Sequence, residues 1–124
     1  MRDSSSQFYK KLLGGKGELI VETYLKKKGY KILEKNYRTN FGEADIIAMH
    51  ENLLVFVEVK TRSGTKYGNP AEAVGYYKQN RYFKLAEYYA LKHPDYRDKC
   101  VRFDVAEVLN GEINYIENAF SCRR

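Results

Sequence analysis

Residues 53–57, LLVFV, are apolar at every position, and they constrain the fold of this chain more than any other stretch. A strand with one solvated face alternates apolar and polar side chains, whereas a strand covered on both faces does not. The run therefore predicts a central strand that is covered on both faces. A second strand is expected over 43–50, and Glu51-Asn52 forms the turn between the two, so the pair predicts an antiparallel hairpin.

The rest of the chain predicts helices and strands on either side of this hairpin. In chain order we expect a helix over 16–28, strands over 30–38, 43–50 and 53–61, a helix or pair of helices over about 70–92, and strands over 100–109 and 112–117. The order α-β-β-β-α-β-β predicts an α/β fold, a mixed sheet flanked by helices. A chain of 124 residues suits one domain, 1–124, in which residues 1–13 either fray or extend the first helix.

Three charged side chains, Asp45, Glu58 and Lys60, interrupt the apolar hairpin. Glu58 and Lys60 are two positions apart and so share one face of their strand. In an antiparallel hairpin, residues at equal distances from the turn lie opposite each other. This rule places Asp45 opposite Glu58, with Cβ atoms roughly 4.5–5.5 Å apart. Carboxylates this close repel each other unless one is protonated or a hard cation such as Mg²⁺ binds both. The residues alone leave a second interpretation open, in which Lys60 forms a surface ion pair with one of the acids.

The distribution of charge favours an anionic partner, nucleic acid first. The net charge is +6. Residues 1–40 hold 10 Lys and Arg against 4 Asp and Glu, and residues 61–100 hold 8 against 4, whereas residues 41–60 hold 1 against 4. A polyanion would be attracted by the basic flanks and repelled by the acidic hairpin, unless a metal ion neutralised the hairpin.

Several classes of protein are excluded by composition. No apolar window of some 18 residues is present, so no membrane span and no membrane partner is expected. The N-terminal segment lacks the apolar run of a secretory signal, which predicts a cytoplasmic location. Cys100 and Cys122 are the only cysteines, and they fit reduced thiols better than a disulfide framework.

The stretch GEADIIA…LVFVEVKTR resembles the YraN-like family of bacterial proteins, and the resemblance extends over about 14–120. That family is similar to archaeal Holliday-junction resolvases and other nucleases of the restriction-endonuclease-like, PD-(D/E)xK superfamily. The superfamily places an acid on one strand, then Asp or Glu, a spacer and Lys on the next, and Asp45, Glu58 and Lys60 match this pattern. The resolvase-like branch adds a glutamate on the first helix, which Glu18 matches.

This resemblance implies a restriction-endonuclease-like fold and metal-dependent hydrolysis of phosphodiester bonds in DNA, including branched, Holliday-junction-like DNA and single-stranded regions. Asp45, Glu58, the Val59 carbonyl and Glu18 would hold Mg²⁺ or Mn²⁺, and Lys60 would orient or deprotonate the attacking water. A symmetric homodimer is implied by the resemblance alone.

Two alternatives belong to other functional classes. The first is an accessory nucleic-acid-binding module of DNA repair, recombination or uptake that has the nuclease fold but little or no catalysis. The second is an interaction protein whose metal site is structural. Loss of Asp45, Glu58 or Lys60 would favour the accessory module, and all three residues are present.

Further residues are candidates for supporting roles. Glu22 lies one helical turn after Glu18, and we interpret it as a solvated helix charge, whereas Asp104 is expected to bond a backbone group. The twelve tyrosines are interpreted mainly as packing groups, with base stacking as the alternative. Candidates for contact with nucleic acid are Lys16, Arg62, Lys78 and Gln79. Related resolvases carry a glutamine that faces the metal site, and the resemblance implies this role for Gln79 as the alternative to packing in its tyrosine-rich segment.

Overall fold

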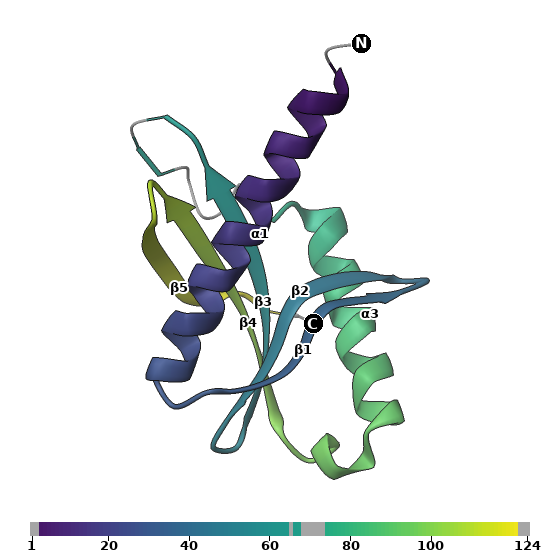
Figure 1. Ribbon diagram of the computed structural model, residues 1–124. Coiled ribbons are helices and arrows are strands. Elements are labelled where there is room, and N and C mark those ends of the chain that lie inside the picture. The colour runs from purple at the N-terminus through teal and green to yellow at the C-terminus, as the bar shows by residue number, and fades with distance from the viewer. Residues whose placement is uncertain (1–2, 65, 68–73, 122–124) are drawn as a thin grey trace.

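A five-stranded sheet with a helix on each face forms the protein (Figure 1). The computed structural model describes residues 3–64, 66–67 and 74–121, with side chains described from residue 15 onward. In chain order the elements are α1 (Asp3–Lys27), β1 (Lys31–Thr39), β2 (Gly42–His50), β3 (Leu53–Arg62), α3 (Tyr76–Lys92), the 3₁₀ turn η1 (Pro94–Tyr96), β4 (Cys100–Leu109) and β5 (Glu112–Phe120). This order confirms the predicted α/β fold and the mixed sheet flanked by helices.

The apolar strand β3 is the centre of the sheet, as its sequence predicted. The strand order is β1-β2-β3-β4-β5, and β3 pairs in parallel with β4, whereas the other neighbours are antiparallel. The parallel pair requires a crossover connection, and α3 lies within it. Because side chains alternate along β3, Phe56 points toward α3 and Val55 and Val57 point toward α1.

Two apolar layers result, one under each helix. Under α3, the ring of Tyr89 packs edge-on against Phe56, and Leu85 is fully buried. Under α1, Val21 and Leu25 pack on the opposite face of the sheet. None of the helices in the described part of the chain is long and apolar enough to cross a membrane.

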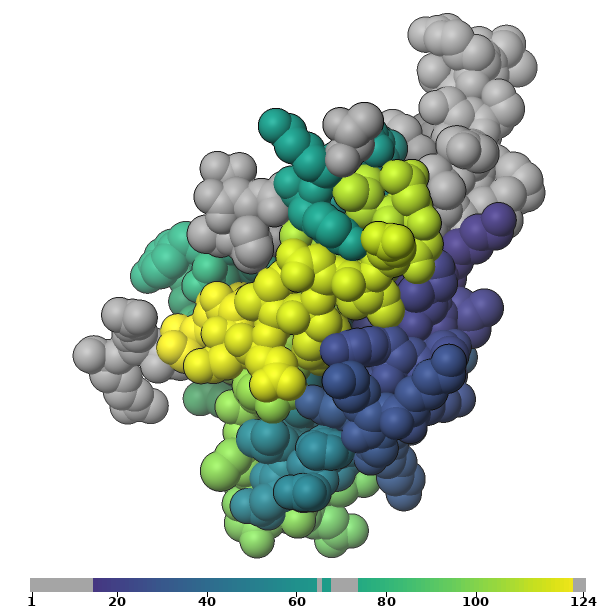
Figure 2. All heavy atoms as spheres, turned by 90° about the vertical axis from the view of Figure 1, so that its left-hand side faces the viewer, coloured from purple at the N-terminus to yellow at the C-terminus, as the bar shows by residue number. Residues whose placement is uncertain are grey.

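Helix α1 lies close against the end of β3. A β-carbon added at Gly17 would fall 2.2 Å from Thr61 Oγ1, so only glycine lets the helix backbone approach the strand this closely. Farther along, Tyr24 of α1 stacks on Tyr115 of β5 with ring centroids 5.2 Å apart, and Figure 2 shows the two elements side by side on this surface. Both contacts fix the helix that carries Glu18.

Some boundaries differ from the predicted ones. The second helix begins at Tyr76 within the described residues, and residues 70–73, where we expected it to begin, lie outside them. Strand β5 continues to Phe120 rather than ending at residue 117. The continuation passes through a bulge at Asn118, whose φ of 53° is one that asparagine tolerates better than most residues.

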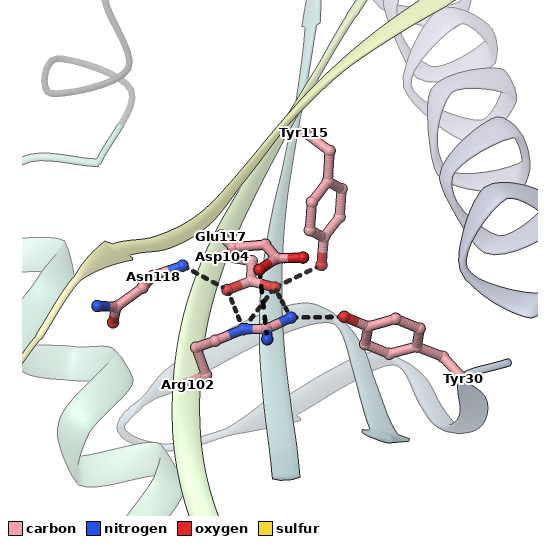
Figure 3. Close-up of polar contacts among 6 residues, drawn as sticks. All are labelled: Tyr30, Arg102, Asp104, Tyr115, Glu117 and Asn118. Atoms are coloured by element: carbon pink, nitrogen blue, oxygen red, sulfur yellow. Dashed lines mark hydrogen bonds and ion pairs between the residues drawn. The ribbon is translucent and has the colours of Figure 1, made fainter. Parts of the chain in front are cut away.

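The buried carboxylate of Asp104 organises this bulge (Figure 3). Arg102 donates to both of its oxygens at 2.9 and 2.8 Å, Tyr115 donates a hydroxyl hydrogen at 2.6 Å, and the Asn118 backbone N–H donates at 2.8 Å. Arg102 also donates to the Tyr30 hydroxyl at 2.6 Å. Burial raises the pKa of Tyr115, and the Asp104 charge raises it further. The prediction that Asp104 bonds a backbone group is confirmed.

Candidate functional site

Asp45 lies where β2 and β3 separate. The two strands pair in the register that the two-residue turn predicted. This pairing extends from the turn to Ile46, which lies opposite Val57. The next pair would be Asp45 with Glu58, but strand pairing ends before it. Instead, Asp45 Oδ2 accepts a hydrogen bond from the Val59 backbone N–H at 2.8 Å. At the open end of the hairpin, the Asp45 carboxylate therefore accepts the hydrogen bond that a backbone carbonyl of β2 would accept in a continuing strand pair.

Glu58 points toward α3 and is almost fully buried. Its Oε1 accepts a hydrogen bond from the Tyr82 hydroxyl at 2.6 Å, and its Oε2 accepts one from Lys78 Nζ at 2.5 Å. Lys78 and Tyr82 are four residues apart and so lie on one face of the helix, one above the other. Both oxygens of Glu58 are thereby fixed in position by the first turns of α3.

The electrostatics of this pair of acids favour a bound cation. Burial raises the pKa of Asp45 to about 7, the Glu58 charge adds to this effect, and the Val59 N–H opposes it. The Glu18 charge raises the pKa of Asp45 further. Burial and Glu58 also raise the pKa of Tyr82, so its hydroxyl remains a donor. The Lys78 charge lowers the pKa of Asp45, but by less than burial and the two acids raise it.

The structure separates Glu18 from Glu22, the two acids that the helical spacing could not fully distinguish. Glu18 is partly exposed, and its charge acts on Asp45. Glu22 is only 9% exposed and pairs with Lys26 at 2.8 Å and Lys35 at 3.2 Å. The interpretation of Glu22 as a solvated charge is therefore wrong, because α1 turns this side chain toward a lysine of β1.

Lys60 lies beside Glu107, its partner in the parallel register of β3 and β4. Glu107 is fully buried, and its Oε2 accepts hydrogen bonds from Arg62 Nε and Nη2, both at 2.9 Å. Sequence reasoning missed Glu107. The signal that could have found it is the one that singled out Asp45, a carboxylate inside an otherwise apolar strand.

The remaining candidates for nucleic acid contact occupy different places. Lys16 is exposed on α1, whereas Arg62 is engaged by Glu107 and Lys78 by Glu58. The side-chain amide of Gln79 donates to the Val74 carbonyl at 2.9 Å, just before α3. Gln79 thus bonds the backbone ahead of its own helix, and a role at the metal site stays a prediction.

The oxygen donors at the hairpin fit a hard divalent cation. Among the described residues no three His, Cys, Asp or Glu side chains are grouped closely enough to hold a metal by themselves. Mg²⁺ commonly takes only one or two carboxylates and completes its shell with water and substrate oxygens. Asp45, Glu58 and the adjacent Val59 carbonyl offer such a set. The pKa of Asp45 is raised by burial first and by the Glu58 charge second, and a cation would offset both effects.

Fold and site together define an α/β protein whose mixed sheet carries two neighbouring acids at the open end of its central hairpin. Comparison with known proteins agrees with the sequence resemblance, because the model of the uncharacterised protein family UPF0102 matches residues 17–108. The chain belongs to the UPF0102 family, to which the YraN-like proteins belong.

Individual relatives match nearly the whole chain. A UPF0102 protein of Caldanaerobacter subterraneus subsp. tengcongensis is 47% identical over 118 residues, which cover 90% of this chain and 96% of the relative. One of Alkaliphilus metalliredigens is 49% identical, with 89% and 98% covered. A third, of Thermodesulfovibrio yellowstonii, is 50% identical, with 87% and 95% covered. The names of these relatives give the family and no activity.

Proposed function

We propose that this protein is a metal-dependent endonuclease that hydrolyses phosphodiester bonds in DNA. The observation that carries the proposal is the position of Asp45, whose carboxylate accepts a hydrogen bond from the Val59 N–H next to the buried Glu58. Two acids held on neighbouring strands, with a lysine two residues after the second, form a rigid set of groups for chemistry on phosphate. The basic sequence on both sides supports DNA as the substrate.

Asp45, Glu58 and the Val59 carbonyl would hold Mg²⁺ or Mn²⁺, and Glu18 would add a carboxylate from α1. The bound ion would supply Lewis-acid stabilisation of the phosphate and a more acidic water. Lys60, which shares the face of Glu58 on β3, would orient the attacking water or accept its proton. These roles follow the assignments that the family resemblance implied.

The residues around Glu58 would hold the site in shape. Tyr82 fixes one oxygen of Glu58 through its hydroxyl, and its own high pKa keeps that hydroxyl a donor. Lys78 offsets part of the charge of the acids and lies at the opening of the site, where it would also meet a substrate phosphate. Placement by packed secondary structure is more accurate than placement by loops.

An accessory DNA-binding module with little or no catalysis is the second candidate. The ion pair between Lys78 and Glu58 favours it, because an ammonium group already neutralises the acid that would bind the metal. In that case the basic surface would bind DNA while the acidic hairpin served the stability of the fold.

Cleavage assays separate the two candidates. Wild type and the Lys60→Ala variant are incubated with labelled Holliday junctions, flaps, single strands and duplexes in Mg²⁺, Mn²⁺ or EDTA. A nuclease cuts at least one substrate only with metal, and the Lys60 variant loses that activity. An exposed lysine of the loop after β3, Lys66→Ala, serves as the matched control and keeps it. Binding without cleavage in every arm overturns the nuclease proposal and supports the accessory module.

We further propose a cytoplasmic protein that acts on junctions as a symmetric dimer, because cutting two strands of a junction requires two active sites. Light scattering gives the molar mass of the protein alone and of its complex with a junction, and hence the number of chains per junction. Two chains per junction support the dimer, and one chain per junction contradicts it.

A further inference from the structure

A cleft of about 470 Å³ lies between the first turns of α3 and the turn that joins β1 and β2. Its walls include Arg38, Thr39, Tyr77, Lys78, Arg81 and Tyr82. Lys78 and Tyr82 also bond Glu58, so the cleft opens directly beside the pair of acids. None of the roles assigned above uses Tyr77, Arg38 or Arg81.

The aromatic wall of the cleft is an exposed tyrosine. Tyr77 is 75% exposed, and the guanidinium of Arg81 lies 5.7 Å from the centre of its ring. With three quarters of its surface in water, the Tyr77 residue contributes little to packing. The preceding Tyr76 is 81% exposed but lines a different pocket, with Gln79 and Phe83. The two neighbours are therefore alike in exposure and differ in what they face.

The cationic wall is fixed by the backbone of the β1–β2 turn. Arg81 Nε donates to the Phe41 carbonyl at 2.5 Å. Gly42, with φ of 148°, brings the turn so close that an added β-carbon would lie 3.1 Å from Arg81 Nε. This anchoring leaves the other nitrogens of the guanidinium at the cleft. Arg38 pairs with Glu43 at 3.3 Å, and both side chains are exposed. Such a surface pair is weak, and a phosphate can replace its carboxylate.

We infer that this cleft binds one unpaired nucleotide of single-stranded DNA, with the base stacked on Tyr77 and the flanking phosphate on Arg81 and Arg38. The inference rests on the proposed action on DNA and names the part of the substrate that enters. A volume of about 470 Å³ suits a single nucleotide. Aromatic rings beside cations are the usual platform for unpaired bases, because every base has a face that stacks.

The position of the cleft makes unpaired DNA the preferred substrate class. A nucleotide held at Tyr77 places the adjoining backbone toward Lys78 and the acids beyond it. DNA with an unpaired strand, such as a flap or a frayed junction arm, therefore binds more tightly than a closed duplex of equal length.

The test measures binding in EDTA, so that cleavage does not enter the readout. Fluorescein-labelled dT15 and a blunt 15-base-pair duplex are titrated with wild type and with the variants Tyr77→Ala, Tyr77→Phe and Tyr76→Ala. Loss of one stacked base weakens binding roughly 5- to 150-fold. We expect Tyr77→Ala to lose that much affinity for dT15 and less than threefold for the duplex. Tyr77→Phe and Tyr76→Ala keep wild-type affinity.

A second readout reports stacking itself. The fluorescence of 2-aminopurine placed within the oligonucleotide falls when the base stacks, and we expect this quenching with wild type and Tyr76→Ala but not with Tyr77→Ala. The inference would be overturned if Tyr77→Ala bound dT15 and quenched 2-aminopurine as wild type does. It would also be overturned if Tyr76→Ala lost as much affinity and quenching as Tyr77→Ala. If binding depends on Tyr77 but the protein cuts no substrate with Mn²⁺, the inference about the cleft stands and only the nuclease proposal is rejected.

Discussion

Lys78 Nζ lies 2.5 Å from Glu58 Oε2, so an ammonium group of α3 occupies a coordination position on the acid that is expected to bind a metal. Glu58 is nearly buried, whereas the Lys78 side chain is 45% exposed and can move away. The same carboxylate oxygen cannot serve both cations at full strength. Lys78 and a divalent ion are therefore competitors for Glu58.

Removing this competitor strengthens metal binding. The Lys78→Met variant keeps the length of the side chain and loses its charge. We expect it to bind Mn²⁺ about 3- to 10-fold more tightly than wild type in calorimetric titrations, since a partly exposed charged hydrogen bond contributes modestly. Lys84→Met, at an exposed position of the same helix, leaves Mn²⁺ affinity unchanged. Unchanged or weaker Mn²⁺ binding in Lys78→Met would show that the lysine does not compete.

The pKa of Asp45 makes stability depend on pH. It is about 7 in the folded protein, mainly through burial, and near 3.8 in an unfolded chain. Between these values the folded state holds one proton more, so the free energy of unfolding falls as the pH rises from about 4 to about 7. Asp45→Asn cannot titrate. We expect its stability relative to wild type, measured by urea unfolding in EDTA, to rise by about 3 kcal/mol over this range.

Two outcomes check that interpretation. Excess Mn²⁺ stabilises wild type more than Asp45→Asn at pH 8, because the ion prefers the charged carboxylate. A stability difference between the two proteins that stays constant from pH 4 to pH 8 would show that the pKa of Asp45 is not raised.

The close approach of α1 to β3 predicts opposite effects at two glycines. Gly17→Ala forces its new methyl group against Thr61 and destabilises the protein by about 1–3 kcal/mol. Gly15→Ala, two residues earlier, meets no atom within 4 Å and stabilises the helix by up to about 1 kcal/mol. Urea unfolding measures both. Adding Thr61→Ala to Gly17→Ala restores much of the loss, and a loss that persists would place the clash elsewhere.

The cluster around Asp104 serves stability. Asp104→Asn leaves Arg102 without its buried partner and destabilises the protein by about 3 kcal/mol or more in thermal or urea unfolding. The matched control is Glu117→Gln, since this 64% exposed acid lies 3.7 Å from Arg102 and contributes less than about 0.5 kcal/mol. Neither change alters Mn²⁺ affinity. A fall in Mn²⁺ affinity in folded Asp104→Asn would contradict the separation of the two acidic clusters.

The sequence determines the central hairpin and its register because local rules govern both. The all-apolar run requires a strand that is covered on both faces. The two-residue turn sets which residues lie opposite each other, and the alternation of side chains along a strand sets which of them share a face. What the sequence did not reveal depends on contacts between distant segments. The Lys78 ammonium reaches Glu58 only because α3 packs over β3, and Glu107 finds Arg62 only because β4 joins β3 in parallel. Neither contact has a signal in residue spacing.

The most direct test of the central claim uses Asp45→Asn, which keeps the shape of the side chain and removes its charge. Labelled flap and junction DNA is incubated with wild type, Asp45→Asn and the control Glu22→Gln in Mn²⁺, with folding verified by circular dichroism. We predict cleavage by wild type and Glu22→Gln, and a loss of at least 100-fold in rate for Asp45→Asn, as expected when a metal ligand is removed. Cleavage by folded Asp45→Asn at the wild-type rate would contradict the assignment of this hairpin as the active site.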